Sequence, residues 1–281
     1  MCGAVLHDGE MSLAITLPSR SAGTLIRQWR QRRRLSQLDC ALEAEISQKH
    51  LSFIESGRSQ PSRDMVLRLA ERLDVPLRER NAIMLAAGFA PVFPERSLDD
   101  PALAPARAAV EMILKGHEPY PALAVDRHWS LVSANAAVQR LLGLVTDQTL
   151  LCAPVNVLCL SLAPGGLSPH IVNLAQWRAH VLERLRQQIT LSGDHQLAAL
   201  REALKRLPAP AGGDGLDNDV VEKLGGIAVP LRIRTPAGTL SLISTTTVFG
   251  TPIDVTVSEL ALETFFPADE ATAAALRTMA A

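Results

Sequence analysis

The sequence lacks the features that mark secreted, metal-binding and membrane-spanning proteins. Its 281 residues include four cysteines, which form no Cys-x-x-Cys pair and have no histidine at metal-ligand spacing. Neither a zinc site nor a disulfide framework is therefore expected. No stretch reaches the roughly 18 apolar residues of a membrane span, and the first nineteen residues lack the long apolar run of a secretory signal. We expect a cytoplasmic protein with reduced thiols and no membrane partner.

Catalytic signatures are also scarce. The chain has neither a G-x-S-x-G elbow nor a P-loop, and its seven histidines are scattered. One alternative stays open, an autoregulated enzyme with a catalytic C-terminal half in which Cys152 or Cys159 acts with His170. No convincing nucleophile and base pair supports it, so we expect a protein that is not an enzyme and needs no metal or cofactor.

Charge is distributed unevenly along the chain. The formal net charge is −1, with 47% hydrophobic and 20% charged residues, which suits one large or two ordinary domains. Residues 20–63, in contrast, carry nine basic and four acidic side chains, a local charge of +5. A basic N-terminal region and an acidic remainder indicate that the first part meets a polyanion.

Residues 24–89 read as five short helices with short turns. Ser36, Ser47 and Ser62 are candidate N-caps, Pro76 opens the last helix, and Gly57 and Gly88 are candidate stops. In the second helix we expect Leu38, Ala41 and Leu42 to face the core. In the third, "QKHLSFIE", Leu51 and Ile54 face inward.

The third helix has the position of a helix-turn-helix recognition helix, whose outward side chains lie in the DNA major groove. Amide, amine and hydroxyl groups there can bond to base edges, and a phenyl ring can pack on a thymine methyl group. The side chain and amide of the residue after Ser36 can meet a phosphate. The expected DNA-binding residues are Gln37, Ser47, Gln48, Lys49, His50, Ser52, Phe53 and Arg58.

The second half has a different organisation. Residues 1–19 are expected to be a disordered leader, with Met11 as a second candidate start, residues 20–90 a DNA-binding domain, and the proline-rich residues 91–106 a linker. Residues 107–281 predict an α+β domain around a curved antiparallel sheet. "YPALAVDRHWSLVSANAAVQRLLG" reads as strand, turn, strand and helix, "LAQWRAHVLERLRQQI" as a helix, and "TPAGT" as a turn between two strands. "PAPAGGDGLDNDV" reads as a polar loop.

Aromatic side chains of this half are equally consistent with an ordinary core and with a small-molecule pocket of a few hundred cubic ångströms. These are Trp129, Trp177, Phe249, Phe265 and Phe266. Arg178, His180 and Arg184, on the helix of Trp177, are the candidate anchors for a polar head group.

Two resemblances narrow the function. "LSQLDCALEAEISQKHLSFIESGRSQPS" resembles the helix-turn-helix of the xenobiotic-response-element (XRE) and phage-repressor class. Gln37, Gln48, Lys49 and Phe53 match the positions that contact bases or phosphates in that class, and Arg30 and Glu55 match its interhelical ion pair. The turn Ala44-Glu45-Ile46 lacks the usual glycine, so slight backbone strain is expected at Glu45 or its neighbour.

The rest of the chain resembles the MmyB-like regulators, through "HEPYPALAVDRHWSLVSANAA", "IAVPLRIRTPAGTLSLIS" and "FGTPIDVTVSELALETFFPAD". This resemblance implies a five-helix, all-α DNA-binding domain followed by a PAS-like α+β domain that binds a small apolar ligand, with a fatty acid as the favoured class. We expect a homodimer on a double-stranded operator with two half-sites. A third alternative is a module that docks other proteins through its helix-turn-helix. Absence of salt-sensitive DNA binding would favour this module over a DNA-binding regulator.

Overall fold

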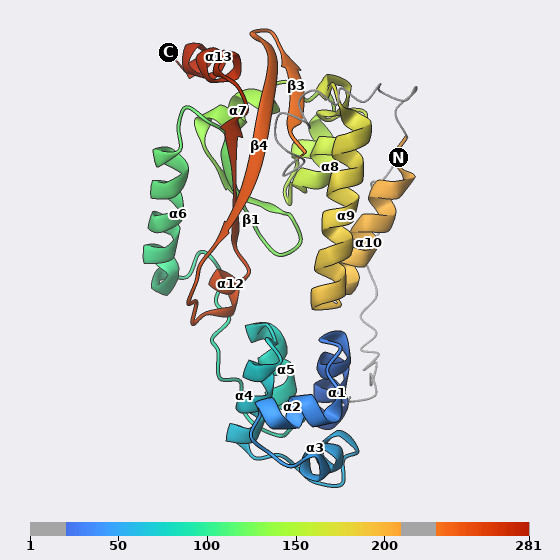
Figure 1. Cartoon of the computed structure of the whole chain (residues 1–281). Coiled ribbons are helices and arrows are strands. Elements are labelled where there is room, and N and C mark those ends of the chain that lie inside the picture. Colours follow the sequence, from blue (N-terminus) through green and yellow to red (C-terminus); the bar gives the residue numbers. More distant parts are fainter. Residues whose placement is uncertain (1–20, 209–228, 281) are drawn as a thin grey trace, which may run out of the picture. The chain divides into compact units, whose positions relative to one another are not determined.

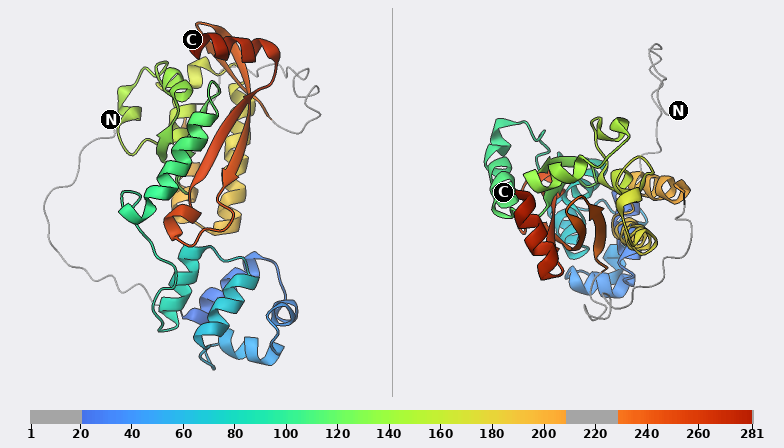
Figure 2. Two further views of the ribbon diagram at one scale, coloured as in Figure 1. Left: turned by 90° about the vertical axis from the view of Figure 1, so that its left-hand side faces the viewer. Right: turned by 90° about the horizontal axis from the view of Figure 1, so that it is seen from above.

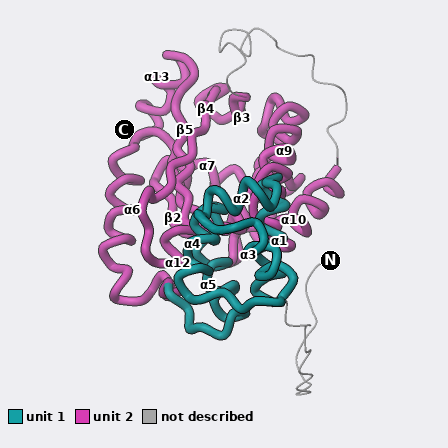
Figure 3. The backbone as a smooth tube through the Cα atoms, turned by 60° about the horizontal axis from the view of Figure 1, so that its bottom comes forward, with its two compact units in different colours: residues 1–92 teal, residues 93–281 magenta. Residues whose placement is uncertain are grey.

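The computed structural model describes residues 21–208 and 229–280. The chain divides into two compact units, residues 1–92 and 93–281, which are coloured separately in Figure 3. The predicted leader lies outside the described residues, as does the predicted polar loop from residue 209 onward. Within the described ranges, none of the helices combines the length and the apolarity that crossing a membrane requires.

The first unit consists of five helices, as predicted. They are α1 (Ala22–Arg32), α2 (Gln37–Glu43), α3 (Gln48–Glu55), α4 (Arg63–Arg72) and α5 (Leu77–Ala86) (Figure 1). The serine caps are confirmed, because the side chains of Ser36, Ser47 and Ser62 each accept a hydrogen bond from a first-turn amide. These caps satisfy amides that a helix start leaves without a partner.

One core of aliphatic side chains joins the five helices. Leu51 and Ile54 of α3 are fully buried, as expected from their spacing. In α2 the expectation for Leu38 and Leu42 is wrong, because both are exposed while Cys40 and Ala41 are buried. A helix of seven residues presents two overlapping apolar stripes, and packing against α3 selects the one that contains Cys40.

The segment after the first unit belongs to the second. The amide of Val255 donates to the Pro94 carbonyl at 2.8 Å, and the Arg96 guanidinium donates to Asp254 at 2.9 Å. A 3-10 helix, η1 (Pro101–Leu103), leads into α6 (Ala104–Gly116), where Pro105 occupies a first-turn position that needs no amide hydrogen. Residues 93–106, expected as linker, therefore pack on the second unit.

The second unit is built on a five-stranded antiparallel sheet, which confirms the expected α+β class. Its strands are β1 (Ala122–Val125), β2 (Leu131–Ala134), β3 (Leu231–Thr235), β4 (Gly238–Val248) and β5 (Ala261–Pro267). Their order is β2-β1-β5-β4-β3, so the last strand in the sequence occupies the centre. The four strands expected from the sequence are confirmed, whereas β5 was not predicted.

Helices cover both faces of this sheet. Beside α6 they are α7 (Ala136–Leu142), η2 (Gln148–Leu151), α8 (Val157–Leu162), η3 (Ser168–His170), α9 (Leu174–Ser192), α10 (His195–Arg206), α12 (Val255–Ser258) and α13 (Glu270–Ala280). Figures 1 and 2 show α6 on one side of the sheet and α9 with α10 on the other. The expected helices α7 and α9 are confirmed.

Strand alternation assigns side chains to the two faces. Leu262 of β5 pairs with Ala124 of β1, and both pack in a cluster with α6. The next residue, Glu263, pairs with Leu123 and with Thr246 of β4, and it points to the opposite face, on the α9 side. Successive residues of a strand point to opposite faces, so Glu263 and Phe265 reach the same space.

Candidate nucleic-acid interface and ligand pocket

The turn between α2 and α3 is tight and strained at one residue. The amide of Ile46 donates to the Ala41 carbonyl at 2.9 Å, which closes the turn. Glu45 adopts a left-handed conformation with φ of 58°. The expected strain at the position without glycine is thus confirmed, because a side chain there crowds the following carbonyl.

A buried ion pair fixes α3 against α1. Arg30 donates through Nε to Glu55 Oε1 at 2.6 Å and through Nη2 to Oε2 at 2.9 Å, and both residues are less than a tenth exposed. Gln37 adds a third donor, at 2.9 Å from Glu55 Oε2. The predicted ion pair of Arg30 and Glu55 is confirmed. The side-chain amide of Gln37, which was expected to meet a phosphate, donates to Glu55 in this structure.

The outward side of α3 presents polar groups to solvent. Gln48, Lys49 and His50 are exposed, whereas Ser52 and Phe53 are half-buried. Ser47 is exposed but engaged as the N-cap, since it accepts from the His50 amide at 3.1 Å. These side chains lie within two turns of one helix whose opposite side is fixed in the core.

Two cations flank the ring of Phe53. The Lys49 ammonium lies 5.7 Å and the Arg58 guanidinium 5.9 Å from the ring centre. Arg58 follows Gly57, which ends α3 with φ of 74°. Positive side chains such as these can contact DNA phosphates, and the amide and hydroxyl groups of the same helix can bond to base edges.

The second unit contains an apolar pocket between α9, α8 and the sheet. Its cavity volume is about 100 Å³, below the expected few hundred, and its lining is almost entirely aliphatic and aromatic. Trp129, Trp177, His180, Arg184 and Phe265 all line it, so five of the predicted residues come together. On α9 the spacing of Trp177, His180 and Arg184 places them on one helix face.

Trp129 is held in an unusual backbone conformation beside this cavity. It has φ of 66° at the end of the turn from β1 to β2, where Asp126 Oδ1 accepts from the amides of His128 and Ser130, each at 2.8 Å. Its indole Nε1 donates to Gln188 of α9 at 2.9 Å. A residue other than glycine keeps a left-handed conformation only where the surrounding structure holds it there. Here the turn and the hydrogen bond to Gln188 hold the indole of Trp129 in the pocket wall.

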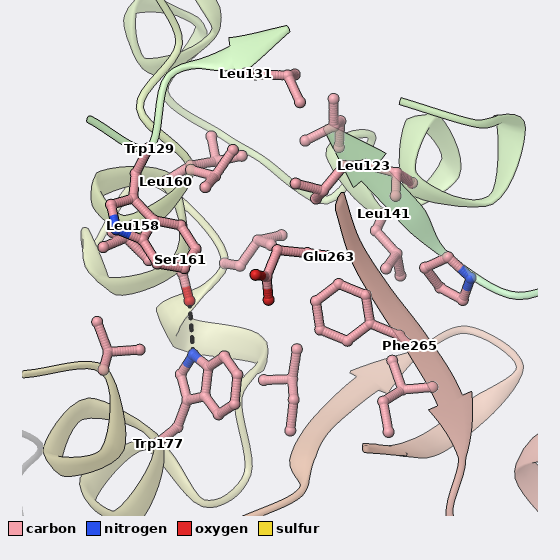
Figure 4. Close-up of a pocket in the computed structure, with 18 of the residues that line it drawn as sticks. Leu123, Trp129, Leu131, Leu141, Leu158, Leu160, Ser161, Trp177, Glu263 and Phe265 are labelled. Atoms are coloured by element: carbon pink, nitrogen blue, oxygen red, sulfur yellow. Dashed lines mark hydrogen bonds between the residues drawn. The ribbon is translucent and has the colours of Figure 1, made fainter. Parts of the chain in front are cut away.

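A second ion pair lies in the wall of the pocket. Arg184 donates through Nη1 and Nη2 to the two carboxylate oxygens of Glu263, at 3.0 and 2.6 Å. Thr246 Oγ1 donates to the same carboxylate at 2.8 Å and also contacts the Arg184 guanidinium. The guanidinium carbon of Arg184 lies over the Trp129 ring, 4.5 Å from its centre. Figure 4 shows the Glu263 carboxylate directed into the space bounded by Trp129, Trp177 and Phe265.

Comparison with known proteins agrees with this two-part organisation. Residues 106–279 match the family model of the MmyB-like transcription regulator ligand binding domain, and residues 26–80 match a helix-turn-helix model. The chain belongs to the MmyB-like transcription regulators. None of the curated proteins matches it in sequence.

Among solved structures, this MmyB-like chain matches the "Structure of an RNA-binding Light-Oxygen-Voltage Receptor" with 16% identity. The match covers 93% of this chain and 64% of that one, with a TM-score of 0.22. The chain thus spans less than two thirds of that structure's length, and a likeness at this score supports no conclusion about fold or function.

Three of the predicted pocket residues lie elsewhere in this MmyB-like regulator. Arg178 donates to the backbone carbonyls of Lys205, Leu207 and Pro208, which fixes the end of α10. Phe249 packs with the cluster under α6, on the opposite face of the sheet. Phe266 is exposed and meets His117 edge to face. None of these three residues lines the pocket. Phe266 directly follows Phe265 in β5, and successive residues of a strand point to opposite faces.

Sequence reasoning missed two polar pocket residues of this regulator. Glu263 is a single acid within the apolar run "ALETFF", and this was the available signal. Ser161, in α8, lines the pocket and accepts a hydrogen bond from Trp177 Nε1 at 2.8 Å. Nothing in the sequence singles out this serine.

The cysteine and histidine alternative gains no geometric support in this MmyB-like chain. Among the described residues, neither Cys152 nor Cys159 is hydrogen-bonded to His170. Burial raises the pKa of the Cys159 thiol, which disfavours the thiolate that a nucleophile needs. The exposed Cys152 thiol donates to the Gln148 carbonyl.

Proposed function

We propose that the protein is a transcription regulator that binds an operator in double-stranded DNA through α3 and responds to a small apolar ligand, such as a fatty acid, in its second unit. The observation that carries the DNA-binding part is the capped, core-fixed helix α3 with Gln48, Lys49 and His50 exposed. Such a helix reads base edges in the major groove. Family membership and the local charge of residues 20–63 support the same function.

Operator binding tests this part of the proposal. The operator is selected from random double-stranded DNA by the full chain, and its affinity is then measured at several salt concentrations. Gln48→Ala should relax the sequence preference at one base position, and Lys49→Ala should weaken binding and lower the salt slope by about 1. Lys205→Ala, which removes the same charge from the second unit, serves as the control. Unchanged affinity and preference in the Gln48→Ala, Lys49→Ala double variant would contradict the assignment of α3.

We propose that the regulator works as a homodimer in the cytoplasm, on two half-sites about 34–36 Å or a multiple of that apart. A two-fold protein matches a palindromic operator, and doubled contacts give the affinity that one short helix lacks. Light scattering of the free chain and of its DNA complex measures the mass. A monomeric mass in both states would refute the dimer.

The ligand part of the proposal rests on the apolar pocket between α9 and the sheet. A ligand that binds one arrangement of this unit more tightly shifts the population toward it, and that shift can alter operator affinity. Mass spectrometry of an organic extract of the purified full chain should find a stoichiometric lipid or fatty acid. The extracted compound should then change operator affinity when it is returned to stripped protein, and no change would remove the regulatory role.

The tryptophans offer a second measurement. Trp129 and Trp177 line the pocket, while Trp29 lies in the core of the first unit. Ligand binding should change the indole fluorescence of the full chain. The change should shrink in Trp177→Phe and persist in Trp29→Phe.

A further inference from the structure

The polar wall of the pocket sets which head group the ligand can carry. Four of its lining residues have polar side chains that hydrogen-bond or ionise at this wall: Ser161, His180, Arg184 and Glu263. The rest of the lining is apolar apart from the indole nitrogens of the tryptophans, which already donate within the protein. Any head group that enters must meet these four side chains.

Arg184 is already neutralised. Both terminal nitrogens of its guanidinium donate to Glu263, which is only 3% exposed, and its central carbon lies over the Trp129 ring. A carboxylate that replaced Glu263 on the guanidinium would leave Glu263 as a buried, unpaired charge. Leaving one partner of a buried pair without its counter-ion is strongly unfavourable.

His180 provides no second cation. Its ring stacks on Trp177, with centres 5.5 Å apart. Burial lowers the pKa of His180, and the nearby Arg184 charge lowers it further, against a smaller opposite effect of Glu263. The neutral imidazole is therefore the form present near neutral pH. Its nitrogens have no hydrogen-bond partner among the described residues.

Two uncharged groups are available to a ligand instead. The Ser161 oxygen accepts from Trp177, and its hydroxyl proton has no acceptor within the described parts of the chain. With the imidazole of His180, it offers a donor and an acceptor beside the apolar lining. A hydroxyl, ester or amide can use both without bringing charge near Glu263.

We infer that the pocket accepts ligands with an uncharged, hydrogen-bonding head group and rejects a free carboxylate, and that Glu263 is the residue that enforces this. The inference rests on the proposed ligand-binding function and narrows it. An alcohol, ester or amide head group meets this requirement, and a fatty acid meets it only in its protonated or esterified form. Repulsion between two carboxylates in an enclosure of low dielectric makes the discrimination large.

A matched series of eight-carbon probes tests the inference. The full chain, stripped of lipid, is titrated at about pH 7.5 with 1-octanol, methyl octanoate and sodium octanoate, the last of which is ionised there. Binding is followed by indole fluorescence and by the shift in Tm. The alcohol and the ester should bind at least about tenfold more tightly than the carboxylate.

The variant Glu263→Gln tests the assigned residue. It keeps the shape of the side chain, removes the negative charge and leaves the Arg184 guanidinium without its counter-ion, so octanoate should gain at least about tenfold in affinity relative to octanol. Glu183→Gln is the matched control, since it removes an exposed acid from the same unit, on α9. It should leave the preference unchanged.

Each result has a definite meaning. Octanoate that binds wild-type protein as tightly as octanol would overturn the inference and leave the apolar-ligand function standing. Absence of binding by all three probes would overturn both. The wild-type comparison decides the question even when Glu263→Gln does not fold. A folded Glu263→Gln that still rejects octanoate would overturn the role of Glu263.

Discussion

Removal of the Glu55 carboxylate should unfold the DNA-binding unit at a much lower temperature. In the structure this side chain accepts three hydrogen bonds, two from Arg30 at 2.6 and 2.9 Å and one from Gln37 at 2.9 Å. Glu55→Ala leaves the Arg30 guanidinium buried between α1 and α3, with the Leu35 carbonyl as its one remaining acceptor among the described residues. The Gln37 amide loses its acceptor as well.

The expected cost follows from this geometry. Breaking a buried ion pair by removing one partner lowers the free energy of unfolding by about 3–5 kcal/mol. In a domain of 60–100 residues each kcal/mol corresponds to a change in Tm of about 4–8 °C. The Tm of the first unit should therefore fall by at least about 12 °C.

Thermal unfolding of the full chain measures this effect, with hydrogen exchange of the amides in α1–α5 to identify the unit that unfolds. The control is Glu43→Ala, which removes an exposed acid from α2. That change should lower Tm by no more than a few degrees. A Glu55→Ala protein with the Tm of the control would refute the buried, bidentate pair.

The same pair makes the stability of this unit depend on pH. Burial acts to raise the pKa of Glu55, but hydrogen bonds from Arg30 and Gln37 outweigh it, and the pKa in the folded state is lowered. The stabilisation is then fully present above the pKa of an unfolded glutamate, about 4.3, and is lost as pH falls through the lower folded value. Urea unfolding of wild type and Glu55→Ala should differ most near pH 7 and converge under more acidic conditions. An equal difference at both extremes would contradict this linkage.

Three further changes test local features. Glu45→Gly should raise the free energy of unfolding by roughly 1 kcal/mol, and Tm by about 4–8 °C, because glycine adopts the left-handed conformation without strain. An unchanged or lowered Tm would argue against strain there. Gly23→Ala should lower the free energy of unfolding, measured in denaturant, by about 1–3 kcal/mol. The new Cβ would lie 2.0 Å from the Ile54 carbonyl oxygen and push α1 away from α3. Wild-type stability in this variant would show that the two helices do not approach so closely. Peptide mapping after treatment with a thiol reagent should find Cys152 modified in the folded protein and Cys40 modified only after unfolding. Cys152 is exposed, whereas Cys40 is buried and burial raises its pKa to about 11. Rapid labelling of Cys40 in the folded protein would indicate an open core.

Local signals in the sequence specify most of the first unit. Three helices begin after a serine N-cap, at Ser36, Ser47 and Ser62. An N-cap bonds within a single turn, so the sequence around it is enough to predict it. The buried positions of α3 follow from helical spacing in the same way. The inward face of α2 does not, because a seven-residue helix has two possible apolar stripes and only contact with α3 decides between them.

The candidate pocket depends much more on tertiary structure. The sequence alone placed Arg178, His180 and Arg184 on the helix of Trp177, and the structure shows that His180 and Arg184 line the pocket with Trp177 whereas Arg178 does not. It could not show that β5, the last strand, lies between β1 and β4, because strand order is set by pairing between segments far apart in the chain. That pairing brings Glu263 opposite Arg184, and one position along the strand decides whether a side chain faces α9 or α6. The sequence by itself therefore determined a helix-turn-helix unit and the family of the second unit, while only the folded sheet decided which charged side chain faces the pocket.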